Sequence, residues 1–261
     1  MQHEAFDAYA PDYDNHFTQT RIGIAQRNRV HKLLVPLLKN CSTITELNCG
    51  TGEDALLFAK RGLTVYATDG SQGMVNTAKQ KNAAYNNVVV STADLRFPEQ
   101  LPGQTVDLIF SNFGGLNCLS PEELKQLAPE LKKRLRFGGI AVFVIMGRNC
   151  WWEQFYFTLK RDKRKHRRKS NTPAAADIGG QVVNTWYYSP KEFAALFLPH
   201  FEIKNAEPVG LFVPPSYLEP FFAGKSFLFS VLVKLDQLLA HGNWCADAAD
   251  HYLIVLKHRE E

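Results

Sequence analysis

Strand-like apolar runs alternate with helix-like stretches through the middle of this 261-residue chain, and this alternation limits its possible folds more than any other feature. Five runs rich in Val, Ile, Leu and Phe are separated by stretches with helical periodicity. The runs span residues 43–48, 63–69, 87–94, 105–113 and 139–147. Because helical crossovers join parallel strands, the pattern predicts an α/β fold. We expect a doubly wound, mostly parallel sheet with helices on both faces.

Local signals mark where several of the intervening helices begin and end. Ser71 stands where a helix would follow the second strand, so we expect its hydroxyl to cap that helix. Ser120 and Glu123 have the spacing of a capping box before an amphipathic stretch. Gly62 follows the first helical pattern and should end it.

The chain is less regular outside residues 41–147. A sixth strand is expected at 200–210 and a last one at 251–258, separated by a helical insertion at about 211–249. A helix is expected at 189–197, whereas residues 170–180, "SNTPAAADIGG", are expected to be flexible. We predict one domain over residues 1–261. It comprises an N-terminal lid and helix (1–40), a ligand-binding core (41–147), an aromatic and basic insertion with a helix (148–200), and the last two strands (201–261).

Cysteine usage and the first residues favour a cytoplasmic protein with reduced thiols. The five cysteines are odd in number, show no CxxC spacing, and follow a start without the features of a signal peptide. We predict no metal site. The apolar stretch at 221–240 is interrupted by Lys225, Lys234 and Asp236, so its uncharged runs fall far short of the roughly 20 residues of a membrane span.

The net charge of +4 is unevenly distributed, because the run "KRDKRKHRRK" at 160–169 alone carries eight Lys or Arg and one Asp. Three interpretations of this basic run stay open: a solvated, mobile face, a contact with RNA or DNA, and a docking site for an acidic carrier protein. Aromatic residues lie beside the run and not within it, which weakens the nucleic-acid interpretation.

A glycine-containing loop, "ELNCGTGEDA" at 46–55, follows the first strand. Ligands of open α/β sheets bind at such loops, beyond the carboxyl ends of the strands. "GTGEDA" matches the dinucleotide pattern, and Asp69 lies 17 residues past Gly52. However, Glu53 and Asp54 occupy the first turn of the following helix, where two carboxylates would repel a pyrophosphate.

Acidic residues recur at the ends of the first three strands, which favours a cationic ligand. Glu46, Asp69 and Asp94 end successive strands, with Glu53 or Asp54 beside the glycines. This acidic ring suits S-adenosylmethionine, which carries a sulfonium, an ammonium, a ribose diol and an adenine amine but no phosphate.

The order of five short motifs resembles the class I S-adenosylmethionine-dependent methyltransferases. The motifs are "ELNCGTG", "VYATDGSQGM", "TADLRFP", "VDLIFSNFGGLN" and "LRFGGIAVFVI", and the resemblance covers about residues 40–147. It implies seven strands in the order 3-2-1-4-5-7-6 with the last antiparallel, S-adenosyl-L-methionine as cofactor and S-adenosyl-L-homocysteine as product. The family usually has glycine where Asn48 stands. Asparagine tolerates positive φ, and its amide could bond the methionine end of the cofactor.

The resemblance also implies a set of cofactor contacts. The methionine moiety would lie near Glu46, Asn48, Cys49, Gly50 and Gly52, and the ribose would bind Asp69. The adenine would lie between two groups of residues, Gly70, Ser71 and Met74 on one face and Ala93, Asp94 and Leu95 at its edge, and both cofactor and acceptor would face Ser111, Asn112 and Phe113. Simpler explanations stay open for several of them. Asp94 suits a turn cap, Met74 the helix core, and Glu46 a buried carboxylate bonded to loop amides, while Glu53 and Asp54 suit the helix dipole.

Methyl transfer from a sulfonium is an in-line displacement that depends mainly on alignment, so no catalytic residue is compelled. Tyr13, His16 and His241 are candidates for a base, although each also suits a packing or surface role. Eleven aromatic residues of the predicted lid pieces suit either ordinary core or a pocket for an apolar or aromatic acceptor: Trp151, Trp152, Phe155, Tyr156, Trp186, Tyr187, Tyr188, Phe212, Tyr217, Phe221 and Phe222. We therefore predict methylation of a small metabolite. The alternatives are a nucleic-acid methyltransferase using the basic run, a non-catalytic cofactor-binding module, and a nicotinamide dehydrogenase.

Overall fold

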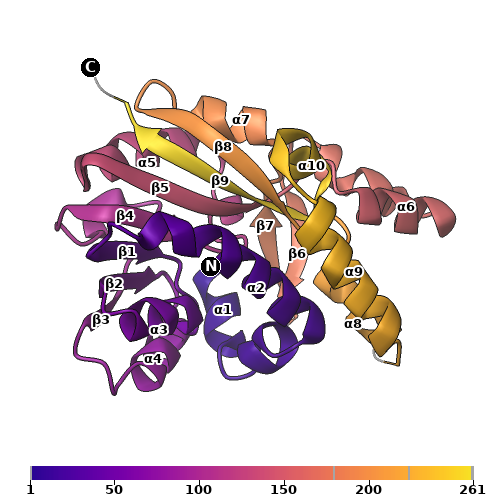
Figure 1. Ribbon diagram of the computed structural model, residues 1–261, viewed down its shortest axis with the longest axis horizontal. Helices are drawn as coiled ribbons and strands as arrows, with labels where there is room; N and C mark the ends of the chain where they lie inside the picture. Colours follow the sequence, from indigo (N-terminus) through magenta and orange to yellow (C-terminus); the bar gives the residue numbers. More distant parts are fainter. Residues whose placement is uncertain (1, 179, 223, 260–261) are drawn as a thin grey trace.

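The computed structural model describes residues 2–178, 180–222 and 224–259, and a seven-stranded sheet runs through them (Figure 1). Its strands, in spatial order, are β3 (Val88–Thr92), β2 (Thr64–Asp69), β1 (Thr43–Leu47), β4 (Val106–Ser111), β5 (Leu135–Met146), β9 (His251–His258) and β8 (Phe201–Val209). The first five pair in parallel, and β9 is antiparallel to both of its neighbours. The predicted strand order and the antiparallel last strand are both confirmed.

Helices of several lengths connect and surround these strands. The α-helices are α1 (Gln2–Tyr9), α2 (Arg21–Leu34), α3 (Glu53–Lys60), α4 (Gln72–Lys81), α5 (Pro121–Lys133), α6 (Trp151–Leu159), α7 (Pro190–Leu196), α8 (Glu219–Phe222), α9 (Ser226–Leu239) and α10 (Gly242–Ala248). Short π or 3-10 turns are η1 (Asp14–Thr18), η2 (Val35–Leu38), η3 (Pro98–Gln100), η4 (Leu116–Cys118), η5 (Lys163–Lys169) and η6 (Ser216–Leu218). Among the described residues, no helix is long and apolar enough to cross a membrane.

Two separate hydrophobic clusters fill the two faces of the sheet. On one face, Leu127 of α5 and Phe193 of α7 pack in a cluster with Phe143 of β5. On the other, side chains of α2, α3 and α4 join those of β1, β2 and β4, and Phe58 meets Phe110 edge-on at 5.5 Å. Helices therefore cover both faces, as the alternation of strands and helices predicts.

The predicted helix boundaries are confirmed by their hydrogen bonds. Ser71 Oγ accepts a bond from Met74 N at 3.1 Å, at the start of α4. Ser120 and Glu123 form a complete capping box at the start of α5. Gly62 takes a φ of +79° just after α3 ends, a conformation that glycine adopts without the steric cost of a side chain.

The prediction of a flexible stretch at 170–180 is wrong for residues 174–178. An antiparallel hairpin joins β6 (Ala174–Ile178) to β7 (Gln181–Thr185), with Ala174 opposite Thr185. The alanines give β6 little strand propensity of their own. Its order comes from pairing with β7, which also packs against α1 at the start of the chain, a contact between distant segments that the local sequence does not reveal.

Replacing Phe110 with Ala should lower the free energy of unfolding by about 3–5 kcal/mol, because its fully buried ring fills the core between β4 and α3. Phe137→Ala is the matched control, since that ring on β5 is 82% exposed and its loss should change stability by less than about 0.5 kcal/mol. Urea unfolding of both variants measures the difference. Equal midpoints would contradict this description of the core.

Candidate functional site

A cavity of about 410 Å³ opens at the carboxyl ends of the parallel strands. Several parts of the chain form its walls. They include the strand ends with the loop after β1, the N-terminal lid segment (residues 2–19), the β6–β7 hairpin, and residues 215–217 of the C-terminal insertion. Its volume lies within the range of small-molecule sites. The predicted lid is thus built from pieces far apart in the sequence (Figure 1).

The loop after β1 owes its shape to three residues with positive φ: Asn48 at 44°, Gly50 at 55° and Gly52 at 78°. Gly52 is required on steric grounds as well, because a Cβ there would lie 2.6 Å from Asn82 Nδ2. Gly50 N donates to Asp69 Oδ2 at 2.9 Å, which ties the loop to the end of β2. The backbone of the loop is therefore fixed where it lines the cavity.

Asn48 keeps the turn intact, as predicted, but its amide is not free for a ligand in the way the sequence suggests. Its Nδ2 donates to the Asn112 carbonyl at 3.0 Å, and its Oδ1 accepts from Ser111 Oγ at 2.8 Å. Gly115 lies directly against this side chain, since a Cβ at Gly115 would be 2.1 Å from Asn48 Cγ. Asn48 therefore ties the end of β1 to the loop after β4.

The two carboxylates expected to bind the nucleoside both line the cavity. Asp69 is held by the backbone, because its Oδ1 accepts from Ser71 N and its Oδ2 from Gly50 N, each at 2.9 Å. Asp94 accepts from Arg96 N at 3.0 Å and pairs with the Arg96 guanidinium at 2.6 Å. The turn-cap interpretation of Asp94 is thus confirmed, and its carboxylate still borders the cavity.

Glu46 is buried at the end of β1 with one oxygen, Oε2, that has no hydrogen-bond partner among the described residues. Burial, together with the nearby charge of Asp54, raises the pKa of Glu46 well above its usual value. An unpaired carboxylate of this kind, in the wall of a cavity, favours a cationic partner.

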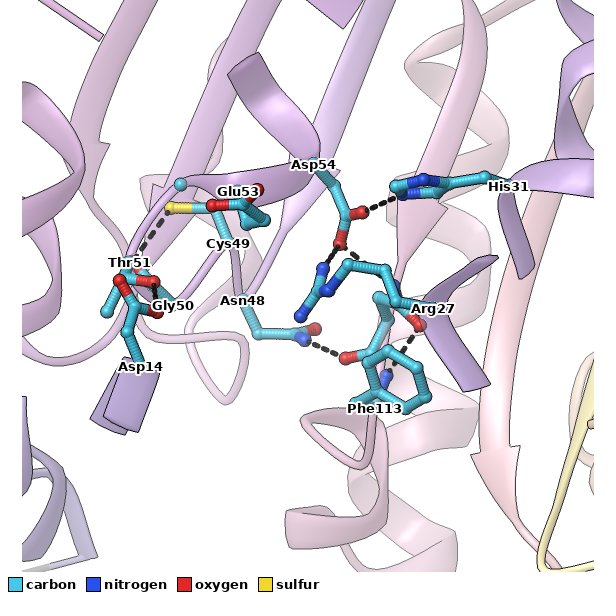
Figure 2. A network of polar contacts seen from close by, with 12 residues as sticks. Asp14, Arg27, His31, Asn48, Cys49, Gly50, Thr51, Glu53, Asp54 and Phe113 are labelled. Atoms are coloured by element: carbon cyan, nitrogen blue, oxygen red, sulfur yellow. Dashed lines mark hydrogen bonds and ion pairs between the residues drawn. The ribbon is translucent and has the colours of Figure 1, made fainter. Parts of the chain in front are cut away.

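Asp54 is buried in a network that links three elements, and Figure 2 shows its carboxylate between Arg27 and His31 of α2. His31 Nε2 lies 2.6 Å from Oδ1, and Arg27 and Asn112 Nδ2 donate to Oδ2. Burial alone would raise the pKa of Asp54, but Arg27 and the bonds from His31 and Asn112 hold it well below its usual range. Asp54 is therefore a structural anion and more than a helix-dipole residue.

The lid segment reaches over the cavity and is fastened to the loop by Asp14. Asp14 accepts from Thr51 Oγ and from Lys81 Nζ, each at 2.6 Å. Tyr13 lies in the cavity wall, where burial raises the pKa of its phenol to about 12. The phenol consequently stays protonated at neutral pH and can donate a hydrogen bond but not serve as a base.

Few of the eleven aromatic residues named for the predicted lid pieces face the cavity. Tyr187 and Tyr217 line it, whereas Trp152, Tyr156 and Phe222 belong to a separate cluster under the C-terminal helices. The prediction of a pocket walled by this aromatic set is therefore wrong for most of its members. Other parts of the cavity wall are formed by aliphatic side chains of the hairpin and by lid and strand-end residues, among them Ala176, Ile178, Val183, Phe17 and Met146.

Two cations of the basic run turn inward, so its interpretation as a solvated face holds for only part of the run, where Lys160, Arg161, Arg164 and Lys169 are exposed. Arg167 pairs with Glu153 at 2.6 Å, and Arg168 bridges Glu153 and Asp250, each at 2.7 Å. Arg168 is 6% exposed, and both arginines line the cavity. Their acidic partners lie 14 or more residues away, so the sequence alone does not pair them.

Sequence reasoning also misses His251, which begins β9 and lines the cavity. Its Nδ1 lies 3.1 Å from Asp250 Oδ2, within ion-pair distance but off the line of a hydrogen bond. Its ring meets Phe113 edge-on at 5.4 Å. Because His251 lines the cavity, it joins His16 on that wall as a candidate for a base.

Most of the predicted site residues converge on the cavity. Its wall includes Glu46, Asn48, Cys49, Gly50, Asp69, Gly70, Met74, Ala93, Asp94, Leu95, Asn112 and Phe113, together with Tyr13 and His16. Gly52, Ser71 and Ser111 stand behind it, because Gly52 packs on α4 and the two serine hydroxyls are used in the bonds given above.

The structure places His241 away from the cavity, against our expectation. Its side chain is 56% exposed at the start of α10, with Nδ1 3.8 Å from Glu207. No group of three or more His, Cys, Asp or Glu side chains within the described ranges is arranged to hold a metal ion.

Taken together, the sheet order, the fixed loop and the acidic strand ends suit an α/β domain that binds a nucleoside bearing positive charge. Residues 44–139 match the family model of the methyltransferase domain. Over these residues the chain is therefore similar to a methyltransferase domain, in keeping with the S-adenosylmethionine-dependent family that its motifs resemble.

Relatives with curated names are similar over part of the chain. A trans-aconitate 2-methyltransferase of Azoarcus sp. strain BH72 is 31% identical over 62% of this chain and 58% of its own length. A ubiquinone/menaquinone biosynthesis C-methyltransferase of Campylobacter jejuni is 28% identical over 53% of this chain and 60% of its own. The chain thus spans about six tenths of these relatives. The N-methyltransferase NodS of Bradyrhizobium japonicum, solved with S-adenosylhomocysteine, shares the fold with a TM-score of 0.60 and 14% identity over 99% of both chains.

Two substitutions of Asn48 separate the stabilisation by its side-chain hydrogen bonds from the cost of its positive φ. Asn48→Ala loses both bonds, worth about 0.5–1.5 kcal/mol each, and keeps a side chain at positive φ. Asn48→Gly loses the same bonds but relieves the backbone, so it should be more stable than the alanine variant by about 1 kcal/mol. Chemical denaturation compares them. An alanine variant as stable as the glycine variant would refute the backbone argument.

Proposed function

We propose that this protein transfers a methyl group from S-adenosylmethionine to a small molecule bound in the same cavity. The observation that carries the proposal is the buried, unpartnered oxygen of Glu46 in a cavity whose floor is a glycine loop. A cationic nucleoside matches this charge, whereas a dinucleotide would bring its pyrophosphate to Glu53 and Asp54 at the start of α3.

The residues of the cavity suggest how each part of the cofactor is held. Asp69 would accept the ribose hydroxyls, while Gly70 and Met74 would meet one face of the adenine. Glu46 and the loop backbone would take the methionine end. The bound cofactor supplies a sulfonium methyl group whose thioether leaves without acid catalysis. The protein's task is then mainly to align the acceptor and to exclude water beneath the lid segment.

The acceptor should be small, because cofactor and acceptor share about 410 Å³. We propose an acceptor with an apolar body, since Ile178, Val183 and Met146 line the cavity. Its reacting group would approach Phe113 and His251, where His251 could remove a proton from a hydroxyl or amine. One of the two curated relatives is named as a C-methyltransferase, and the other is named after a small organic acid, trans-aconitate. We therefore leave open which atom of the acceptor is methylated.

A nucleic-acid acceptor is less well supported. Arg167 and Arg168 are committed to Glu153 and Asp250 inside the protein, which leaves fewer cations of the basic run for phosphates. A non-catalytic module remains the alternative from another class, and it predicts cofactor binding without turnover over a broad screen of acceptors.

Asp69→Ala should weaken the binding of S-adenosylmethionine by about 2–4 kcal/mol, or about 30- to 1,000-fold, because charged hydrogen bonds to the ribose are lost. Asp107→Ala is the matched control. That carboxylate also accepts from two backbone amides, Ser42 N and Thr43 N, but at the opposite end of the sheet. Calorimetry with S-adenosylmethionine and with NADH tests the proposal. Binding of NADH alone, or wild-type affinity of Asp69→Ala, would overturn it.

Asp14→Ala should speed the dissociation of S-adenosylhomocysteine about tenfold, because the lid segment loses its bonds to Thr51 and Lys81. Asp12→Ala removes an exposed carboxylate two residues earlier and should leave the rate unchanged. Stopped-flow measurement of dissociation compares the two variants. Equal rates in both would show that the lid segment does not retain the cofactor.

A further inference from the structure

Large apolar side chains are exposed on four helices that stand at one end of the molecule. We call α6, α8, α9 and α10 the apolar arm, and Figure 1 shows α6, α8 and α9 at the side away from β3. The exposed members include Trp151, Phe155, Leu159, Phe221, Phe227, Leu228, Leu238, Leu239 and Trp244. Phe227 is 85% exposed and Trp244 69%, so these rings face solvent almost completely. Such an accumulation of apolar surface marks an interaction site.

The helices of the apolar arm form one packed unit beneath that surface. Trp152 of α6 meets Phe222 of α8 at 6.3 Å, and Phe222 meets Phe229 of α9 at 6.0 Å. Trp151 and Trp244 join α6 to α10 edge-on at 5.2 Å. The inner aromatic residues therefore have partners within the fold, whereas the outer ones keep much of their surface exposed.

Charges on the arm and on the adjoining basic run are segregated. The acids face inward or are paired: Glu153 and Asp236 are buried, Glu219 accepts from the backbone of α2, Asp162 from Arg164, and Asp247 from Asn149. The cations point outward, since Lys160, Arg161, Arg164, Lys225 and Lys234 are exposed. The arm thus presents aromatic and basic side chains together, without a free acid among its described residues.

We propose that the apolar arm docks the protein onto an anionic lipid surface. Exposed aromatic rings insert at the level of the lipid headgroups, while neighbouring lysines and arginines contact the lipid phosphates. The contact is peripheral, in keeping with helices too short to cross a membrane. A symmetric dimer through the same face is disfavoured, because it would bring two copies of Lys225 and Lys234 into one interface.

The arm continues directly into the wall of the cavity. Pro215, Ser216 and Tyr217 line the cavity and lead into α8. If the proposed function is right, docking would bring the acceptor side of the cavity to the lipid, where an apolar acceptor is concentrated. The docking itself does not depend on that function.

Vesicle co-sedimentation of the full chain tests the docking. We expect binding to vesicles of phosphatidylcholine with an equal part of phosphatidylglycerol, and much weaker binding to phosphatidylcholine alone or at high salt. The double variant Phe227→Ser/Trp244→Ser should lose at least tenfold in affinity, as should Lys225→Glu/Lys234→Glu. The controls are Phe137→Ser, on the exposed part of β5, and Lys39→Glu/Lys125→Glu, at exposed lysines outside the arm.

Three outcomes would overturn the docking: no binding to the anionic vesicles, equal losses in arm and control variants, or a dimer in sedimentation velocity that the arm variants abolish while vesicles are not bound. Thermal unfolding confirms that each variant is folded. Calorimetry with S-adenosylhomocysteine separates this test from that of the proposed function, because the arm variants should bind it as the wild type does.

Discussion

The buried carboxylate of Asp54 is the interaction on which the arrangement of the site depends. Arg27 and His31 of α2 and Asn112 after β4 converge on it, so one anion fixes α2, α3 and the end of β4 relative to each other. Arg27 also lies over the Phe113 ring at 5.1 Å. Removing one member would leave an uncompensated buried charge, which is far more costly than the pair's net contribution.

The core and its strand order follow from the sequence because their determinants are local. The apolar runs define the strands, and the helix ends are set by Ser71, Ser120 and Gly62, each through contacts within a few residues. The sheet then assembles from crossovers with a fixed hand. The loop after β1 is predicted for the same reason, since Asn48 and Gly50 supply the backbone conformation wherever the rest of the chain lies.

Long-range pairing explains what the sequence does not reveal. The inward turn of Arg168 depends on Glu153 and on Asp250, which lies 82 residues further along the chain. The order of β6 depends on β7 and on the contact of β7 with α1. In the sequence, His251 looks like an ordinary strand residue. Once β9 pairs with β5, His251, which is the first residue of β9, lies at the cavity. In each case the sequence shows the side chain but not its partner.

The distribution of charge around the cavity argues for one particular kind of ligand. Asp54 is matched by Arg27, Asp14 by Lys81 and Asp94 by Arg96 on the side of the glycine loop. On the opposite side, Arg167 and Arg168 are matched by Glu153 and Asp250. Against this background, Glu46 is a buried acid whose Oε2 has no hydrogen-bond partner among the described residues. A ligand bearing one cation beside the loop would complete the balance, because that carboxylate is costly to ionise until a positive charge lies next to it.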